Sequence, residues 1–169
     1  MMKVVDNFLP DYYFKQITNV ILTNPFPWYW NDETLYSSHG HHNPNDYQFT
    51  HRIFDLVDGG ILSNYYSLCD ILQLRLGVRK LNRIKMNLRP QTFFHRKGGM
   101  HTDLWGLSSI QKTAVFYVNT NNGWTEFKKG GKVKSVANRI VIFDSNVEHQ
   151  GVTCTDEKRR VVINFNYDI

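Results

Sequence analysis

The fold is decided by residues 139–167, which read RIVIFDSNVEHQGVTCTDEKRRVVINFNY. Two short runs in this stretch, 139–143 and 161–167, are rich in Val, Ile, Phe and Tyr, which is typical of β-strands. The polar segment between them contains His149 and ends in two arginines. We therefore predict a strand, a loop that carries a histidine, and a closing strand that begins with arginine.

The same pattern extends back to residue 81. Strand-like composition recurs in five further short segments, at 81–88, 100–105, 113–118, 123–127 and 132–136. The sequences Asn121-Asn122-Gly123 and Lys129-Gly130-Gly131 favour tight hairpin turns between them. Seven short strands with this spacing predict a mainly β fold of the sandwich or barrel type.

The first 80 residues are expected to support this β-rich part. Apolar residues recur at helical spacing over about 11–24 and 60–76, which predicts two helices. Aromatic residues and turn formers dominate 25–52, so we predict a mostly irregular segment there. A chain of 169 residues without linkers or repeats is expected to form one domain over 1–169, with helical support to about 80 and a β core from about 81.

Composition narrows the functional classes. Two cysteines are too few for a disulfide-built secreted domain, and the N-terminus lacks the apolar run of a signal peptide. No apolar stretch is long enough to span a membrane, so a cytoplasmic protein without a membrane partner is expected. The net charge of +5 permits contact with a polyanion, but the densest basic group, the four lysines of 128–134, favours a solvated hairpin face over a phosphate-binding patch.

The residues with the clearest chemistry are His101-Thr102-Asp103. Side chains of a strand alternate between its faces, so His101 and Asp103 are predicted to point the same way. A distant segment must supply a third metal ligand, and His149 is the best candidate. Two histidines and one carboxylate on one side of a metal form the facial triad of non-haem iron(II) oxygenases, which leaves positions open for a chelating co-substrate and O₂.

Arg159 and Arg160 begin the last predicted strand. A guanidinium that lines a core is costly to bury without an anion. If a metal holds one end of a dicarboxylate, an arginine at this depth can bind the far carboxylate in bidentate fashion. The metal, the dicarboxylate and the arginine would then form one connected line.

Residues 82–169 resemble the prolyl-hydroxylase-like branch of the 2-oxoglutarate/iron(II) oxygenases. The resemblance follows the order of the His101-Thr102-Asp103 motif, the hairpin strands, the run from Asn138 to Phe143, His149 and the arginine pair, and residues 4–10 resemble the opening of small phage-type and marine microbial members. It implies a double-stranded β-helix core of the jelly-roll or cupin-like type. It also implies iron(II) on His101, Asp103 and His149, 2-oxoglutarate as co-substrate, and O₂. Such an enzyme releases succinate and CO₂ as it oxidises, most commonly hydroxylates, its substrate.

The co-substrate residues remain open at the level of sequence. Family spacing, about ten residues past the second histidine, selects Arg159, whereas strand register favours Arg160 together with Asn164 and Asn166. The family also tends to place a Tyr or Asn on the strand before the HxD motif, where this chain has Asn87.

Two other classes of function compete with the oxygenase. One is a β-helix binding module without turnover, and the other is a zinc hydrolase that uses the same triad with water in the open position. His101 and Asp103 can also be read as a simple hydrogen-bonded pair, and His39, His41 and His42 as a metal-binding tract rather than an ordinary loop. The sequence does not choose the prime substrate among protein side chains, nucleic acid and metabolites.

Overall fold

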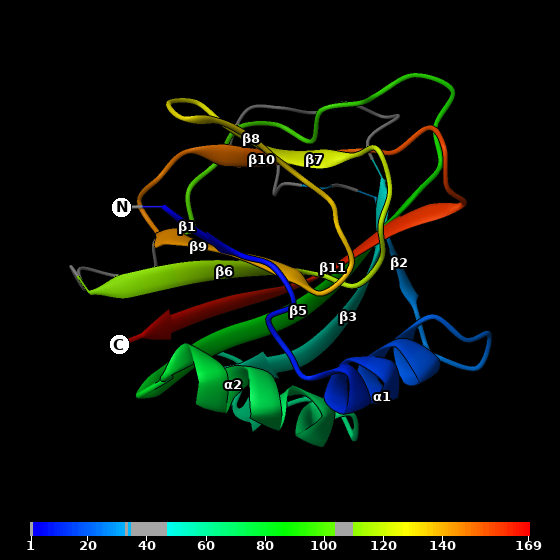
Figure 1. The fold of residues 1–169 in the computed structure, drawn as a ribbon. Coiled ribbons are helices and arrows are strands. Elements are labelled where there is room, and N and C mark those ends of the chain that lie inside the picture. The colour runs from blue at the N-terminus through cyan, green and yellow to red at the C-terminus, as the bar shows by residue number, and fades with distance from the viewer. Residues whose placement is uncertain (1, 33, 35–46, 104–109) are drawn as a thin grey trace.

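The protein is built on two antiparallel β-sheets, with helices packed against the outer side of the larger sheet (Figure 1). The computed structural model describes residues 2–32, 34, 47–103 and 110–169. The larger sheet has the strand order β1-β9-β6-β11-β5-β3-β2, with β4 paired to β3, and the smaller sheet has the order β10-β7-β8.

The elements have the following bounds. The strands are β1 (Lys3–Val5), β2 (Tyr29–Asn31), β3 (Gln48–Asp55), β4 (Gly60–Ile61), β5 (Lys80–Pro90), β6 (Gln111–Tyr117), β7 (Trp124–Phe127), β8 (Gly131–Lys134), β9 (Arg139–Asp144), β10 (His149–Val152) and β11 (Arg159–Asp168). The helices are α1 (Asp11–Ile21), the short 3-10 helix η2 (Tyr66–Cys69) and α2 (Asp70–Leu76).

The larger sheet buries apolar side chains on both of its faces. On β11, Val161, Ile163 and Phe165 belong to the core on the helical side. Val162 points the other way, into a second core between the two sheets, where it meets Phe127 of the smaller sheet. This alternation follows from the pleat of a strand, and a strand buried on both faces reads as a nearly continuous apolar run.

In the described part of the chain, α1, η2 and α2 all lie on the outer face of the larger sheet (Figure 1). Ile17 and Ile21 of α1 are one turn apart and fully or almost fully buried against the sheet. Helix α2 ends at Gly77, whose φ of 66° is the left-handed conformation that commonly terminates helices. The inner face of the sheet is therefore left for a cavity.

Strand β5 has polar side chains on that inner face. Ile84, Met86 and Leu88 lie in the helix-side core. The alternating positions Arg83, Lys85, Asn87 and Arg89 instead line a cavity between the sheets. In the pairing of β5 with β11, Lys85 lies opposite Asn164 and Arg89 opposite Arg160.

The predicted fold class is confirmed, because the protein is mainly β with supporting helices and its two antiparallel sheets are consistent with a jelly-roll core. The predicted helix at 11–24 corresponds to α1. Six of the seven predicted strands correspond to β5, β6, β7, β8, β9 and β11, with ends shifted by at most two residues.

Two predictions in the first half of the chain were wrong. The helix over 60–76 is only the short pair η2 and α2, after a bridge of β4 to β3. The segment 25–52, predicted as mostly irregular, contains β2 and most of β3. Strand β3 was missed because Gln48, Thr50 and His51 are buried in it, so that polar residues mask the apolar alternation.

The predicted strand over 100–105 was also wrong in its described part. His101 makes a single antiparallel bridge to His149, and neither Thr102 nor Asp103 belongs to a strand. The remainder of that prediction, like the tract that holds His39, His41 and His42, lies outside the described residues.

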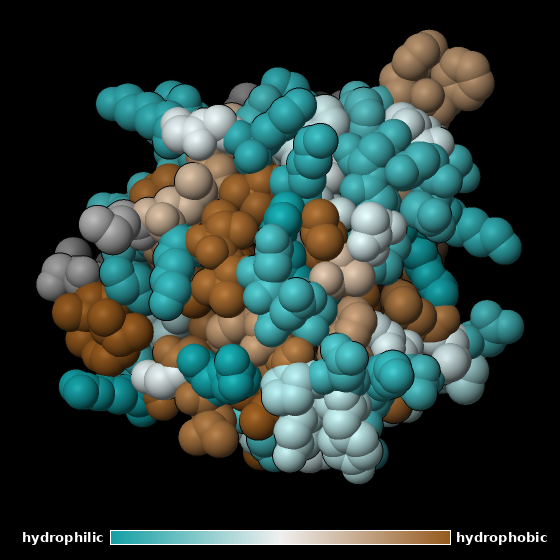
Figure 2. All heavy atoms as spheres, in the orientation of Figure 1, coloured by the Kyte–Doolittle hydropathy of each residue, from teal (hydrophilic) through white to brown (hydrophobic). Residues whose placement is uncertain are grey.

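Figure 2 shows hydrophilic side chains over the β7–β8 hairpin, at the upper left of the view. Lys128 forms an ion pair there with Glu148, with 2.6 Å between Nζ and Oε2, and the Lys132 ammonium lies 4.6 Å from the centre of the Trp124 ring. Within the described ranges, the helices are too short or too polar to cross a membrane.

Candidate metal and co-substrate site

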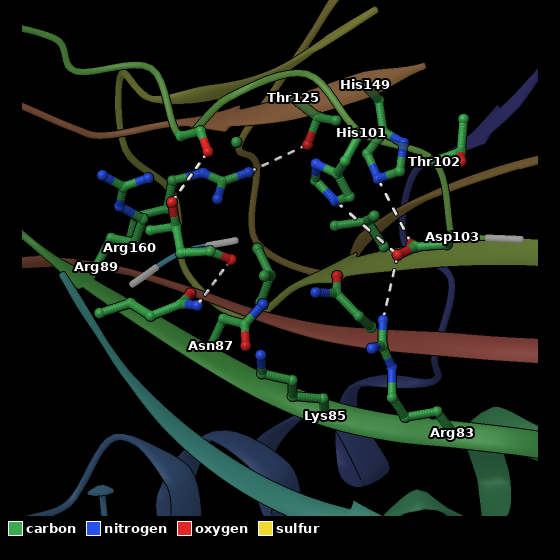
Figure 3. Close-up of a pocket in the computed structure, with 17 residues that line it drawn as sticks. Arg83, Lys85, Asn87, Arg89, His101, Thr102, Asp103, Thr125, His149 and Arg160 are labelled. Carbon is green, nitrogen blue, oxygen red and sulfur yellow. Dashed lines mark hydrogen bonds and ion pairs between the residues drawn. The ribbon is translucent and has the colours of Figure 1, made fainter. Parts of the chain in front are cut away.

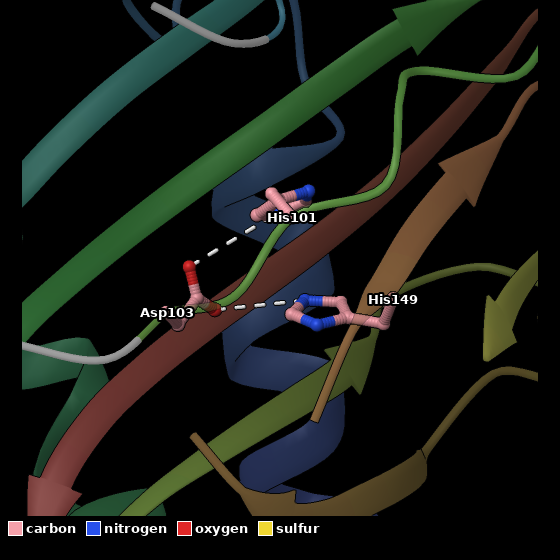
Figure 4. A group of neighbouring side chains, drawn as sticks. All are labelled: His101, Asp103 and His149. Carbon is pink, nitrogen blue, oxygen red and sulfur yellow. Dashed lines mark ion pairs between the residues drawn. The ribbon is translucent and has the colours of Figure 1, made fainter. Parts of the chain in front are cut away.

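Three side chains meet at one end of the space between the sheets. His101, Asp103 and His149 each offer a ligand atom, and these atoms lie within 4.8 Å of one another. The distances are 3.9 Å from His101 Nε2 to Asp103 Oδ1 and 3.6 Å from His149 Nε2 to Asp103 Oδ2 (Figure 4). The donor atoms therefore converge on one point, as the sequence predicted.

Backbone hydrogen bonds hold the three residues in register. The N–H groups of His101 and His149 each donate to the other's carbonyl oxygen, at 3.0 and 2.9 Å. The Asp103 N–H donates to the Ser145 carbonyl at 2.9 Å, in the turn before β10. These contacts take over the role of the regular strand that the sequence had suggested.

Each imidazole is also fixed through its second nitrogen. Nδ1 of His101 lies 3.1 Å from the Gly99 carbonyl, and Nδ1 of His149 lies 3.0 Å from the Val147 carbonyl. A carbonyl only accepts, so both Nδ1 atoms carry the proton and both Nε2 atoms present a lone pair towards Asp103. This is the arrangement in which metal-binding histidines are oriented by neighbouring backbone groups.

The electrostatics of the cluster favour metal ligation. Burial raises the pKa of Asp103, but Arg83 and the two imidazoles more than offset this, so that its pKa is below the ordinary value. Burial, followed by the neighbouring His149, lowers the pKa of His101. An anionic carboxylate and a neutral imidazole are the protonation states that a metal ion requires of its ligands.

The triad opens into a cavity of about 360 Å³ (Figure 3). The lining comes from both sheets, and it includes Arg83, Lys85, Asn87 and Arg89 of β5, Thr125 of β7, and Arg160, Val162 and Asn164 of β11. This volume is within the usual range for sites that bind small molecules. The cavity joins the triad to a cluster of cationic groups.

Arg160 is the most deeply placed of these cations, with only 4% of its surface exposed. Its Nε donates to Ser135 Oγ at 2.9 Å, Nη2 donates to Thr125 Oγ1 at 3.1 Å, and the guanidinium lies 5.6 Å from the centre of the Tyr117 ring. Across the described part of the chain, no carboxylate forms an ion pair with it. Burial, and further the neighbouring Arg89, lower the pKa of Arg160, and a buried cation without an anionic partner is the mark of an anion site.

Arg159 lies on the other side of β11. Its guanidinium donates to the Leu22 carbonyl at the end of α1, and it is not part of the cavity lining. The two arginines are adjacent in a strand and so point to opposite faces. Of the other predicted co-substrate residues, Asn87 and Asn164 line the cavity, whereas Asn166 bonds to Arg83 and Thr113.

Several cavity residues were missed at the level of sequence: Arg83, Lys85, Arg89 and Thr125. The first three were visible in principle, because polar residues at 83, 85, 87 and 89 alternate with apolar ones along a predicted strand. Thr125 carried no such signal. Two further histidines lie outside the site and make structural hydrogen bonds, His51 to Pro27 and Ser63, and His95 to Thr153.

Similarity to known proteins is found in the structure and not in the sequence. No protein-family model matches the sequence, and no curated protein does. An oxidoreductase of the 2OG-Fe(II) oxygenase family from Burkholderia pseudomallei matches with a TM-score of 0.70 at 12% identity, over 99% of this chain and 84% of its own. A Pseudomonas putida prolyl-4-hydroxylase matches with a TM-score of 0.58 at 16% identity, over 99% and 92%. The chain has the fold of the 2-oxoglutarate/iron(II) oxygenases.

The oxygenase fold also occurs in neighbours with other reactions. The non-heme alpha-ketoglutarate-dependent epimerase SnoN from nogalamycin biosynthesis matches with a TM-score of 0.63 at 10% identity, over 99% of this chain and 78% of its own. At such identities the likeness establishes the oxygenase fold alone.

The residues present fit iron(II). Two neutral imidazoles and one buried carboxylate are the donor set of the facial triad. The buried guanidinium of Arg160, in the same cavity, fits the distal carboxylate of a chelating dicarboxylate.

Proposed function

We propose that this protein is a 2-oxoglutarate- and iron(II)-dependent dioxygenase that hydroxylates its substrate with release of succinate and CO₂. The observation that carries the proposal is the placement of Arg160, a buried guanidinium without a carboxylate partner among the described residues, in the cavity onto which His101, Asp103 and His149 open. Iron(II), 2-oxoglutarate and O₂ bound there together supply the oxidising chemistry.

His101, Asp103 and His149 hold the metal in this proposal. The backbone carbonyls of Gly99 and Val147 fix the orientation of the two rings. Arg83 bonds one carboxylate oxygen of Asp103, which keeps the carboxylate anionic and limits its rotation. The protein thus fixes three ligands on one side and leaves the cavity side free.

Arg160 binds the distal carboxylate of 2-oxoglutarate. Thr125 and Ser135 anchor the guanidinium from one side, and the Tyr117 ring packs against it. Burial in this cavity strengthens a charge-assisted bond because little water competes for it. Asn87 and Asn164 are assigned to the remaining polar contacts of the co-substrate, and Arg159, which is bonded to Leu22, is assigned none.

The two competing functions explain less of the site. A zinc hydrolase needs a general base, yet in the described lining Asp103 is the sole carboxylate and it is already committed to the triad. Hydrolysis also has no use for Arg160. A binding module without turnover would keep the same contacts, so only an assay separates it from an enzyme.

The experiment that tests the proposal is succinate formation from 2-oxoglutarate. Protein loaded with iron(II) under anaerobic conditions is exposed to O₂, beside a His101→Ala variant. We expect slow succinate release from the wild type without prime substrate and none from the variant. Iron-dependent binding of 2-oxoglutarate without succinate would favour the binding module. The absence of both binding and turnover would refute an oxygenase site.

A further inference from the structure

Lys85 lines the cavity, but it has no role in the proposed reaction. It lies in the middle of β5, opposite Asn164 of β11, and its side chain points into the cavity below Arg160 and the triad (Figure 3). In the described part of the chain no hydrogen bond or ion pair engages its ammonium group. Asp103 attracts it through space, but that carboxylate is already bonded to Arg83.

The position of this ammonium is energetically unfavourable in the free protein. Burial, with Arg83 as the second cause, lowers the pKa of Lys85 to about 8. The group therefore still carries its charge at neutral pH, in surroundings that disfavour a charge. A lysine held in this way becomes favourable once an anion lies against it.

The charges of the described lining residues, counted with iron(II) and 2-oxoglutarate in place, indicate what kind of further ligand suits the cavity. Iron(II) and the dianion of 2-oxoglutarate cancel each other, and Arg83 cancels Asp103. Arg160 then contributes one positive charge that is not balanced, and Lys85 contributes a second. Arg89 is not included in this count. A cavity with a surplus of positive charge selects for an anionic ligand.

A neighbouring amide adds a second requirement. The side-chain oxygen of Asn87, two residues along the same face of β5, is buried and accepts no hydrogen bond. Buried acceptors are normally satisfied, so a donor on a ligand suits this position. A small molecule that carries an oxyanion and a nearby hydroxyl or amine would satisfy both Lys85 and the side-chain oxygen of Asn87, while the amide N–H groups of Asn87 stay available to the co-substrate.

We propose that Lys85 binds an oxyanion of the prime substrate, a carboxylate or a phosphate, so that the substrate is a small anionic molecule. This inference rests on the proposed function, because it assigns Lys85 to the substrate and Arg160 to the co-substrate. Lys85 is a binding residue that sets specificity, and it takes no part in holding the metal.

The test uses two calorimetric titrations of the whole protein loaded with Mn(II), a redox-inert stand-in for iron(II). The first adds 2-oxoglutarate. The second adds inorganic phosphate, or acetate in a separate arm, to the protein saturated with 2-oxoglutarate. The variants are Lys85→Met, Lys85→Arg and, as a matched control, Lys80→Met, which removes an exposed lysine at the start of the same strand.

We expect the wild type to bind one oxyanion per chain in the second titration. Lys85→Met should weaken this binding tenfold or more, Lys85→Arg should retain most of it, and Lys80→Met should leave it unchanged. The stronger of the two arms identifies the kind of oxyanion. The affinity for 2-oxoglutarate should be the same in all four proteins.

Three outcomes would overturn the inference while the proposed function stands. These are no oxyanion binding after normal 2-oxoglutarate binding, equal binding by the wild type and Lys85→Met, or a loss of 2-oxoglutarate affinity in Lys85→Met, which would assign Lys85 to the co-substrate. Failure of the wild type to bind 2-oxoglutarate in the first titration would overturn the proposed function and this inference together. Melting temperatures of the variants establish that they are folded.

Discussion

The partly buried Arg83 and the buried Asp103 form an ion pair that links β5 to the segment 101–103, which carries two of the triad residues. Nη2 of Arg83 lies 3.2 Å from Oδ1 of Asp103. Nε of Arg83 also donates to Asn166 at 3.0 Å, and Asn166 donates in turn to Thr113. The carboxylate thus belongs to a polar network that spans three strands of the larger sheet.

The first prediction concerns the loss of this ion pair. Arg83→Met leaves the Asp103 carboxylate buried without its cation, and breaking a buried pair in this way commonly costs about 3–5 kcal/mol. We expect a loss of stability of roughly that size in the metal-free protein, measured by urea denaturation. Metal that binds the triad should restore part of it, because a ligand that binds only the folded state stabilises it.

A surface pair provides the control for Arg83. Lys128 and Glu148 are bonded but both exposed, so Lys128→Met should cost at most about 1 kcal/mol. Equal losses from the two variants would show that the Arg83–Asp103 pair is as well solvated as a surface pair, and the argument for a fixed carboxylate would fail.

Most strands of the β-rich half could be predicted from the sequence alone. The runs that became β6, β9 and β11 are continuous apolar segments because the larger sheet is buried on both faces. Strand β3 gave no such signal, since its buried polar groups are satisfied by partners far along the chain, such as His51 by Pro27 and Ser63. The prediction that 1–169 forms a single domain, and that of a cytoplasmic location, stay predictions.

The identity of the candidate metal ligands could be predicted from the residue types and their order. The orientation of the two arginines could not, because it depends on the backbone register of the last strand. The convergence of His101, Asp103 and His149 followed from their types and order, although the strand expected at 100–105 is absent from its described part. The choice between Arg159 and Arg160 needed the register of β11, which turns Arg160 into the cavity. The roles assigned to these residues stay predictions.

The second prediction separates the two arginines. Arg160→Met removes the only co-substrate cation that we assign, and a hydrogen bond to a charged group contributes about 1.5–3 kcal/mol. We therefore expect the dissociation constant for 2-oxoglutarate to rise roughly 10- to 150-fold in calorimetry with Mn(II)-loaded protein. Arg159→Met serves as the matched control and should leave that constant unchanged. A reversal of the two results would place the co-substrate on the other side of β11.

The third prediction concerns Gly123, at the turn into β7. A Cβ at this position would lie 2.9 Å from Cδ of Arg160 and 2.8 Å from the Val152 carbonyl oxygen. Gly123→Ala should therefore displace both groups, cost about 1–3 kcal/mol of stability, and weaken 2-oxoglutarate binding. Gly151→Ala is the control, because its Cβ would lie 3.4 Å from Nη1 of Arg160, an ordinary contact. The two variants are compared by urea denaturation and calorimetry, and equal behaviour would contradict close packing around Arg160.

The last prediction is a pH dependence that belongs to Lys85. Its pKa is lowered by burial to about 8 in the folded protein, whereas an unfolded chain has the ordinary value of 10.5. Between pH 8 and 10.5 the unfolded state binds a proton that the folded state does not, so this group makes the free energy of unfolding rise with pH across that window.

The Lys85→Met variant lacks this contribution. We expect the metal-free variant to be more stable than the wild type at pH 7 and the difference to shrink as the pH approaches 10.5. Urea denaturation of both proteins at pH 7, 9 and 10.5 measures the difference, in which the other titrating groups cancel. A difference that stays constant with pH would mean that the Lys85 ammonium is fully hydrated in the free protein. The cavity would then give no reason to expect an anion at this position.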